Sequence, residues 1–340
     1  MLALSIAAAA CSEGAGQPDG GDDGGADAGD DGGTPDGGAP DGGVAVLWES
    51  HATGHPGYFS DVVATGGTAF TAVGSGGAVA RSVDGRSWTL SASGAAKALL
   101  AVTRSAALGG TLIAAGEEGA IFTSADDGAN WRARNFAGGP TLRGLAVGSP
   151  TILAVGDQGT VYGSLDAQTF DLRAQGGPYF SAAAFKPGGT YVAVGLGAAS
   201  AGVAQTSTDL GRNWTTRLTV GRNLADVIWS NSRGLFVAAG AEGKIYTSSD
   251  ALGWTPRFEG ADLDFVRVRE CGGKLVAISV RQRVCIPEQQ CPPLTRLYAS
   301  ADGIAWQLWT TLSGTAVYGL ACSGRTVAVG SAVLSTAAAP

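Results

Sequence analysis

One short pattern occurs six times along this sequence and limits what the chain can fold into. The copies are "SVDGRSW" (82–88), "SADDGANW" (124–131), "SLDAQTF" (164–170), "STDLGRNW" (207–214), "SSDALGW" (248–254) and "SADGIAW" (300–306). Their first aspartates are separated by 42, 40, 43, 41 and 52 residues. A period near 40 is typical of a four-stranded unit repeated round a β-propeller.

The residues around each copy support four strands per repeat. "LIAAGEEGAIFTS" (112–124) and "ILAVGDQGTVYGS" (152–164) both place a short polar turn between two apolar runs, as in a β-hairpin. A further apolar run lies upstream, such as "LRGLAVG" (142–148), and the aromatic residue opens a fourth strand, such as "WTTRLTV" (214–220). No helical periodicity is visible, so the chain is predicted to be all-β.

Six copies of the pattern do not mean six blades. The segment "VYGLACSGRTVAVGSAVLST" (317–336) matches the first three strands of a seventh repeat, but no fourth strand follows it. The segment "VAVLWES" (44–50) precedes the first complete repeat and carries an aromatic residue, Trp48, without a repeat of its own. We therefore predict a seven-bladed β-propeller over residues 44–340, with the last blade closed by this N-terminal strand.

The pattern resembles the Asp-box, or bacterial neuraminidase repeat, S-x-D-x-G-x-x-W, over nearly the whole chain beyond residue 44. The resemblance places each copy in the turn between the third and fourth strands of a blade. There an aspartate can accept hydrogen bonds from downstream backbone N–H groups, and the aromatic ring can fill the space between blades. The residues expected to have this structural role are Asp84, Trp88, Asp126, Trp131, Asp166, Phe170, Asp209, Trp214, Asp250, Trp254, Asp302 and Trp306.

The first residues, "MLALSIAAAAC" (1–11), resemble the end of a secretory signal followed by a lipobox. This run is too short to span a membrane, and the basic segment that normally opens a signal is absent. We expect residues 1–10 to be a signal-peptide remnant and Cys11 to carry the lipid, which anchors the protein in the cell envelope; the alternative is a plain secretory signal with a chance cysteine. Ser12 fits sorting to the outer membrane of a Gram-negative bacterium.

Residues 11–43 are expected to form the lipidated cysteine and a disordered tether. The segment after Cys11 is rich in Gly, Asp and Pro, lacks core-forming residues, and has neither EF-hand spacing nor a regular calcium-binding nonapeptide. It holds nine acidic residues and no basic one, and therefore accounts for the formal net charge of −7. The arginines of the remainder are scattered, so no nucleic-acid partner is indicated.

Four further cysteines favour disulfides in an exported chain. Cys285 and Cys291 flank an insertion between the second and third strands of blade six, whereas Cys271 and Cys322 occupy the same turn after the first strand in blades six and seven. Because turns after the first and second strands lie on opposite faces, we expect the pairs Cys285–Cys291 and Cys271–Cys322. A zinc site is the rival, but the spacing does not fit and His51 and His55 are the two histidines. No metal or cofactor is expected.

The repeat also suggests an enzyme, because sialidases share it. The resemblance implies an arginine triad, a Tyr/Glu nucleophile pair and an acidic Asp, with an F/Y-R-I-P element near the first blade. That element is missing, since the corresponding region reads "HPGYFSDVVATGG" (55–67). Arg143, Arg222 and Arg267 are candidates on first strands or their approaches, but nothing in the sequence joins them to a tyrosine and a carboxylate. A sialidase-like glycoside hydrolase remains the alternative function.

A binding surface is the function that the sequence favours. The loops that lead into the innermost strands ring the mouth of a propeller's channel, and here they carry aromatic and charged residues typical of ligand sites. The candidate binding residues are Tyr58, Phe59, Asp61, Arg143, Tyr179, Phe180, Arg222, Asp264, Phe265 and Tyr318. The alternative for each is packing between blades.

The repeats also resemble the photosystem II assembly-factor group, seven-bladed propellers that act as scaffolds. This resemblance favours a scaffold over an enzyme, without indicating photosynthesis. We expect an envelope protein or a glycan as partner.

Overall fold

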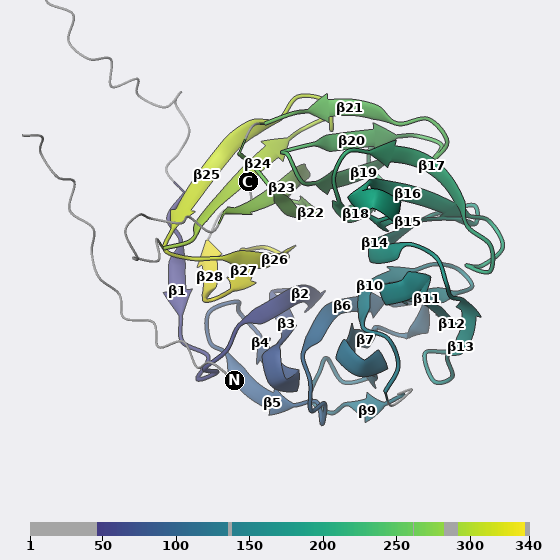
Figure 1. The fold of residues 1–340 in the computed structure, drawn as a ribbon. Helices are drawn as coiled ribbons and strands as arrows, with labels where there is room; N and C mark the ends of the chain where they lie inside the picture. Colours follow the sequence, from purple (N-terminus) through teal and green to yellow (C-terminus); the bar gives the residue numbers. More distant parts are fainter. Residues whose placement is uncertain (1–45, 135–137, 261, 282–291, 337–340) are drawn as a thin grey trace, which may run out of the picture. The chain divides into compact units, whose positions relative to one another are not determined.

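The computed structural model describes residues 46–134, 138–260, 262–281 and 292–336. In this part of the chain, seven four-stranded antiparallel sheets surround a common centre (Figure 1). The first strand of each sheet is innermost, and neighbouring first strands contact one another all the way round the ring. The protein is therefore a seven-bladed β-propeller, as the repeat spacing predicts.

The strands follow the chain in order within each blade. Blades one to four contain β2 (Phe59–Gly66), β3 (Ala69–Gly74), β4 (Ala78–Ser82) and β5 (Thr89–Ala92); β6 (Leu99–Ser105), β7 (Thr111–Gly116), β8 (Ile121–Ser124) and β9 (Arg132–Ala133); β10 (Leu142–Val147), β11 (Ile152–Gly156), β12 (Val161–Ser164) and β13 (Asp171–Ala174); and β14 (Tyr179–Lys186), β15 (Thr190–Leu196), β16 (Gly202–Ser207) and β17 (Thr215–Val220). Blades five to seven contain β18 (Leu224–Ser230), β19 (Leu235–Gly240), β20 (Ile245–Ser248) and β21 (Thr255–Phe258); β22 (Phe265–Cys271), β23 (Lys274–Arg281), β24 (Leu294–Ser300) and β25 (Gln307–Ser313); and β26 (Val317–Cys322), β27 (Thr326–Gly330), β28 (Val333–Thr336) and β1 (Glu49–His51). Short 3-10 turns occur at Ser75–Gly77, Ala106–Leu108, Glu117–Gly119, Asp157–Gly159 and Ala198–Ser200.

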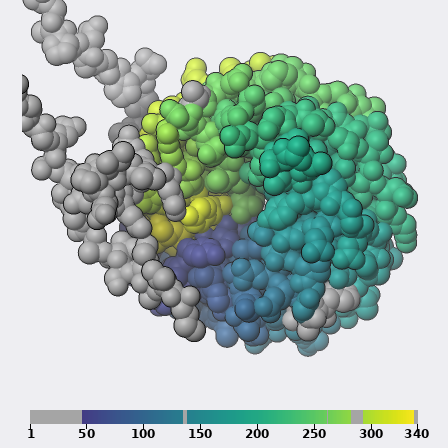
Figure 2. All heavy atoms as spheres, in the orientation of Figure 1, coloured from purple at the N-terminus to yellow at the C-terminus, as the bar shows by residue number. Residues whose placement is uncertain are grey.

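The seventh blade is closed by a strand from the other end of the chain. Strand β1 pairs antiparallel with β28, with Glu49 opposite Ser335 and His51 opposite Val333. The purple residues of blade one accordingly lie beside the yellow residues of blade seven in Figure 2. The predicted closure is confirmed. The closing strand is shorter than the predicted segment 44–50, and residues 44 and 45 lie outside the described residues.

The core of the described residues consists of seven apolar clusters, each shared by two neighbouring blades. The aromatic residue that ends each copy of the repeat packs into the seam with the preceding blade. Trp214 of blade four, for example, belongs to a cluster with Leu153 and Val161 of blade three, and its ring centroid lies 5.3 Å from that of Phe180. Blade seven has no such copy. Trp48, directly before β1, fills the corresponding seam and lies 5.9 Å from the ring of Trp309. The unassigned tryptophan of the sequence is therefore the seventh seam aromatic.

The six repeated turns share one set of hydrogen bonds. In "STDLGRNW", the hydroxyl of Ser207 donates to Oδ1 of Asp209 at 2.8 Å, and that oxygen also accepts the backbone N–H groups of Arg212 and Asn213. The N–H of Gly211, at φ 86°, donates to Ser207 Oγ at 2.9 Å. The other five turns repeat the Ser–Asp bond and the N–H donors to the aspartate. These aspartates therefore hold turns.

The hydrogen bonds lower the pKa of all six aspartates. For Asp126, the backbone N–H and side-chain amide of Asn130 are the main causes, and the pKa falls to about 2. For Asp209, burial raises the pKa, but the bonds from Asn213, Ser207 and Arg212 outweigh it and lower the pKa to about 2. These carboxylates are thus ionised at neutral pH and serve as acceptors.

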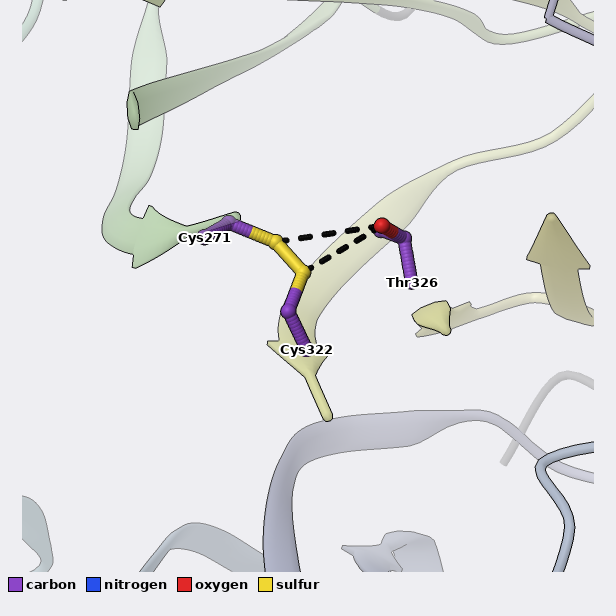
Figure 3. Close-up of a disulfide and its surroundings, with 3 residues drawn as sticks. All are labelled: Cys271, Cys322 and Thr326. Carbon is purple, nitrogen blue, oxygen red and sulfur yellow. Dashed lines mark hydrogen bonds between the residues drawn. A yellow bond between two sulfur atoms is a disulfide. The ribbon is translucent and has the colours of Figure 1, made fainter. Parts of the chain in front are cut away.

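The disulfide Cys271–Cys322 joins blades six and seven (Figure 3). The two cysteines end β22 and β26, their Cα atoms lie 5.3 Å apart, and the hydroxyl of Thr326 donates to Cys322 Sγ at 3.3 Å. This predicted pair is confirmed, since the spacing of neighbouring first strands suits a disulfide. Cys285 and Cys291 lie outside the described residues, and so does Cys11 with residues 1–45. Within the described chain, no helix has the length and apolarity needed to cross a membrane.

Candidate functional site

A β-bulge at the start of every first strand shapes the mouth of the channel. In all seven blades the register between the first and second strands slips by one residue, for example between Phe59 and Asp61. A bulge redirects the side chain of its extra residue. The seven bulge residues all line a recess of about 590 Å³ and are Ser60, Leu100, Arg143, Ser181, Ala225, Val266 and Tyr318. We call this recess the mouth; it lies where the first strands begin, on the face opposite the six repeated turns.

Three tyrosines stand round the mouth. Tyr58 is 41% exposed and lies edge-on to Tyr318, with ring centroids 6.1 Å apart. Tyr179 lies on the wall formed by blades three and four. Burial raises the pKa of both Tyr179 and Tyr318, so both phenols are neutral at neutral pH. They offer ring surface together with a hydroxyl that can donate a hydrogen bond.

Arg143 is held in place on one wall. Its Nε lies 2.6 Å from Oδ1 of Asp157, and its guanidinium carbon lies 4.7 Å from the centroid of the Tyr179 ring. Burial by itself lowers the pKa of Arg143, but the bond to Asp157 outweighs it and the pKa is raised. This wall is therefore charge-balanced and rigid.

Arg267 is held differently on the opposite wall. Its Nε donates to the backbone carbonyl of Tyr318 at 2.8 Å, and its Nη2 donates to that of Ser60 at 3.0 Å. Within the described part of the chain, Arg267 has no carboxylate partner and its Nη1 has no hydrogen-bond acceptor. The mouth therefore contains a positioned cation that has no adjacent counter-ion among the described residues.

Two polar atoms in the same wall also lack partners. Ser60 is 7% exposed, and its Oγ makes no hydrogen bond to a described residue; Oδ1 of Asn223 is likewise buried and unbonded. Both residues line the mouth. Buried polar atoms are nearly always paired in proteins, so these two indicate a place where a polar ligand or water completes the bonding.

Below the mouth, an ion cluster crosses the central channel, whose volume is about 420 Å³. Arg269 in blade six donates to Asp226 of blade five at 2.6 Å and to Asp61 of blade one at 3.3 Å. Asp226 also accepts the N–H of Val268, and Asp61 accepts that of Val102, each on the next blade. The cluster ties the innermost strands together and leaves neither carboxylate free for acid–base chemistry.

The structure brings some of the candidate residues together and separates others. Tyr58, Arg143, Tyr179 and Tyr318 line the mouth. Asp61 lies deeper, buried in the ion cluster, and Arg222 and Asp264 line a separate recess with Glu242 and Arg281. These three predicted binding residues therefore do not line the mouth with the tyrosines.

Phe59, Phe180 and Phe265, which were also predicted as binding residues, do not line the mouth. Each is at most 2% exposed and belongs to a seam cluster. The physical reason is the bulge, which points the residue after each phenylalanine into the mouth and leaves the phenylalanine facing the core. Ser60 and Asn223 were not predicted from the sequence, and Arg267 was named as a candidate without the carbonyl groups that hold it. An alignment of the seven first strands could have indicated the bulge residue, because the first position is always apolar while the middle position varies. The aligned starts are "FSD", "LLA", "LRG", "FSA", "LAD", "FVR" and "VYG".

The described residues include no group of three or more His, Cys, Asp and Glu placed to hold a metal ion. His51 and His55 lie near the seam between blades seven and one, where each ring bonds to a serine hydroxyl, of Ser335 and Ser75 respectively.

Comparison with known proteins shows the fold. No family model matches the chain, and no curated protein matches its sequence. Among solved structures, YCF48 from Cyanidioschyzon merolae is 15% identical with a TM-score of 0.62, over 85% of this chain and 98% of that one. YCF48 bound to D1 peptide is 14% identical with a TM-score of 0.64, over 88% and 99%. The WD40 β-propeller domain of Doa1 is 15% identical with a TM-score of 0.62, over 86% and 97%.

Proposed function

We propose that this protein is a non-catalytic binding protein of the cell envelope, which captures a partner protein at the mouth of its propeller. The observation that carries the proposal is the composition of the mouth. Among the described residues, one recess is lined by three tyrosines, by an arginine without a carboxylate partner and by two residues that each carry a buried, unpaired polar atom, a combination typical of recognition sites. One structurally similar propeller was solved with a bound peptide, which supports a polypeptide rather than a glycan as partner.

Site-specific photocrosslinking tests the proposal. A photoreactive phenylalanine analogue replaces Tyr58 in the mouth, and in a matched control replaces Leu172, which is 52% exposed on an outer strand. We expect a discrete protein adduct from position 58 in envelope preparations, identified by mass spectrometry, and none from position 172. The triple variant Tyr58→Ala, Tyr179→Ala, Tyr318→Ala should compete poorly for the same partner while still folding. Adducts from position 172 alone, or with glycans only, contradict the proposal.

We propose further that the six repeated turns are Asp-boxes and that lipidated Cys11 anchors the protein to the outer membrane of a Gram-negative bacterium. The shared hydrogen bonds of the turns and the sequence "AAAC" support these assignments. Labelling with a fatty-acid analogue tests the anchor, because the variant Cys11→Ala should lose both the label and the membrane association. A variant that stays in the membrane fraction contradicts it.

The structure offers little support for the alternative, a sialidase-like hydrolase. Such an enzyme needs a nucleophilic tyrosine, and burial raises the pKa of Tyr179, with Asp157 adding to the effect. Of the carboxylates that line the channel among the described residues, Asp61 and Asp226 are bonded to Arg269 and Glu270 is bonded to Arg233. Hydrolysis of a fluorogenic sialoside that is abolished by Tyr179→Phe would favour the enzyme instead.

A further inference from the structure

The Arg267 wall of the mouth is a built polar subsite. It combines the guanidinium of Arg267 with the unpaired Ser60 Oγ and Asn223 Oδ1, all lining the same recess. Arg267 Nη2 is bonded to the carbonyl of Ser60 itself, and its Nε is bonded to the carbonyl of Tyr318. The cation is therefore fixed by contacts to blades one and seven before any ligand arrives.

The charge of Arg267 sets this arginine apart from the others nearby. Arg143 has Asp157, Arg222 has Glu242, and Arg269 has two aspartates. Arg267 has two carbonyl partners, which accept hydrogen bonds without cancelling the charge. A partly buried guanidinium in this state is best complemented by a carboxylate, which can accept a charge-assisted bond from Nη1.

We infer that the subsite binds a carboxylate of a partner polypeptide, with Arg267 as the charge partner and Asn223 as the acceptor for a backbone N–H. This rests on the proposed function. Asn223 Oδ1 is a hydrogen-bond acceptor and therefore needs a donor. A polypeptide supplies such a donor in the amide N–H next to its carboxylate. The serine hydroxyl can serve either group, and Tyr318 lines the same recess. The carboxylate can be the chain terminus or an Asp or Glu side chain.

Small-molecule probes distinguish a terminal carboxylate from a side-chain carboxylate. With the full chain, ligand-observed NMR titrations measure the dissociation constants of N-acetyl-L-leucine, its uncharged amide, and N-acetyl-L-aspartic acid α-amide, whose carboxylate is a side chain. We expect at least one acid to bind about tenfold or more tightly than the uncharged amide, because a charge-assisted bond to arginine is lost in the amide. The tighter acid identifies the source. Equal binding of acids and amide overturns the inference.

Variants locate the probe. Arg267→Gln should weaken the preferred acid about tenfold or more, and Arg267→Lys should weaken it less. Arg212→Gln, an exposed arginine in a repeated turn on the opposite face, is the matched control and should bind normally. Because Arg267 also holds two backbone carbonyls, Asn223→Asp provides a test that leaves them intact: its added negative charge should weaken the acid and not the amide. Undiminished acid binding by both Arg267→Gln and Asn223→Asp overturns the inference.

Two outcomes distinguish a failure of the carboxylate inference from a failure of the proposed function. Sialyllactose also carries a carboxylate, and its Arg267-dependent binding in place of the amino-acid probes would overturn the assignment to a polypeptide. If crosslinking at position 58 yields the partner while the acids bind no better than the amide, the carboxylate inference fails and the proposed function stands.

Discussion

Removing the charge of Arg269 is expected to destabilise the propeller strongly. The substitution Arg269→Met keeps an unbranched stem without the charge and leaves Asp61 and Asp226, each 3% exposed, without their cation. Breaking a buried ion pair from one side costs about 3–5 kcal/mol. Asp226 keeps the N–H of Val268, and Asp61 keeps those of Val62 and Val102, so we expect the low end, about 3 kcal/mol. That is a large part of a typical domain stability of about 5–15 kcal/mol.

Urea unfolding followed by tryptophan fluorescence measures this loss. The control is the triple variant Arg269→Met, Asp61→Asn, Asp226→Asn, in which no buried charge remains. If uncompensated charge is the cause, the triple variant should regain most of the free energy of unfolding that the single variant loses. A single variant that loses less than about 1 kcal/mol, or a triple variant as unstable as the single one, refutes the reasoning.

Three further predictions concern the closure of the seventh blade, the disulfide and the repeated turns. Deletion of residues 44–50 removes Trp48 and most of β1, so it should expose the edge of β28 and cause aggregation, measured by light scattering; a deletion protein that melts like the full chain contradicts this. The double variant Cys271→Ser, Cys322→Ser should lose about 2–4 kcal/mol of unfolding free energy, because a bridge over 51 residues no longer restricts the unfolded chain; an unchanged urea midpoint argues against it. The pKa of Asp209 is lowered in the fold to about 2, so its stabilisation is present above its ordinary pKa near 4 and is lost as the pH falls towards 2. The stability difference between the protein and Asp209→Asn should therefore shrink between pH 4 and 2, and a pH-independent difference in melting temperature counts against it.

The repeat made the architecture predictable. Because the spacing of Asp84, Asp126 and their counterparts measures one blade, the sequence alone predicts the strand order, the incomplete seventh blade and its closure near Trp48. The pair Cys271–Cys322 was also predictable, because equivalent turns of adjacent blades are neighbours in any propeller.

The candidate site was predictable only in part. The loops into the first strands pointed to Tyr58, Tyr179 and Tyr318, which do line the mouth. The phenylalanines beside two of them are buried, because side-chain alternation in these strands is reset by a bulge that no local pattern in a single repeat reveals.

The turn "STDLGRNW" is an example of structure that the local sequence determines. The hydrogen bonds of its Ser207 and Asp209 side chains join residues at most four positions apart, so the local sequence specifies this turn and the turn recurs in six blades. The contacts of Arg267 and Arg269 join residues up to 208 positions apart, and they form because seven bulged strands converge on one axis. The sequence by itself therefore determined the blades and their turns, whereas only the tertiary structure decided which side chains meet at the mouth and in the channel.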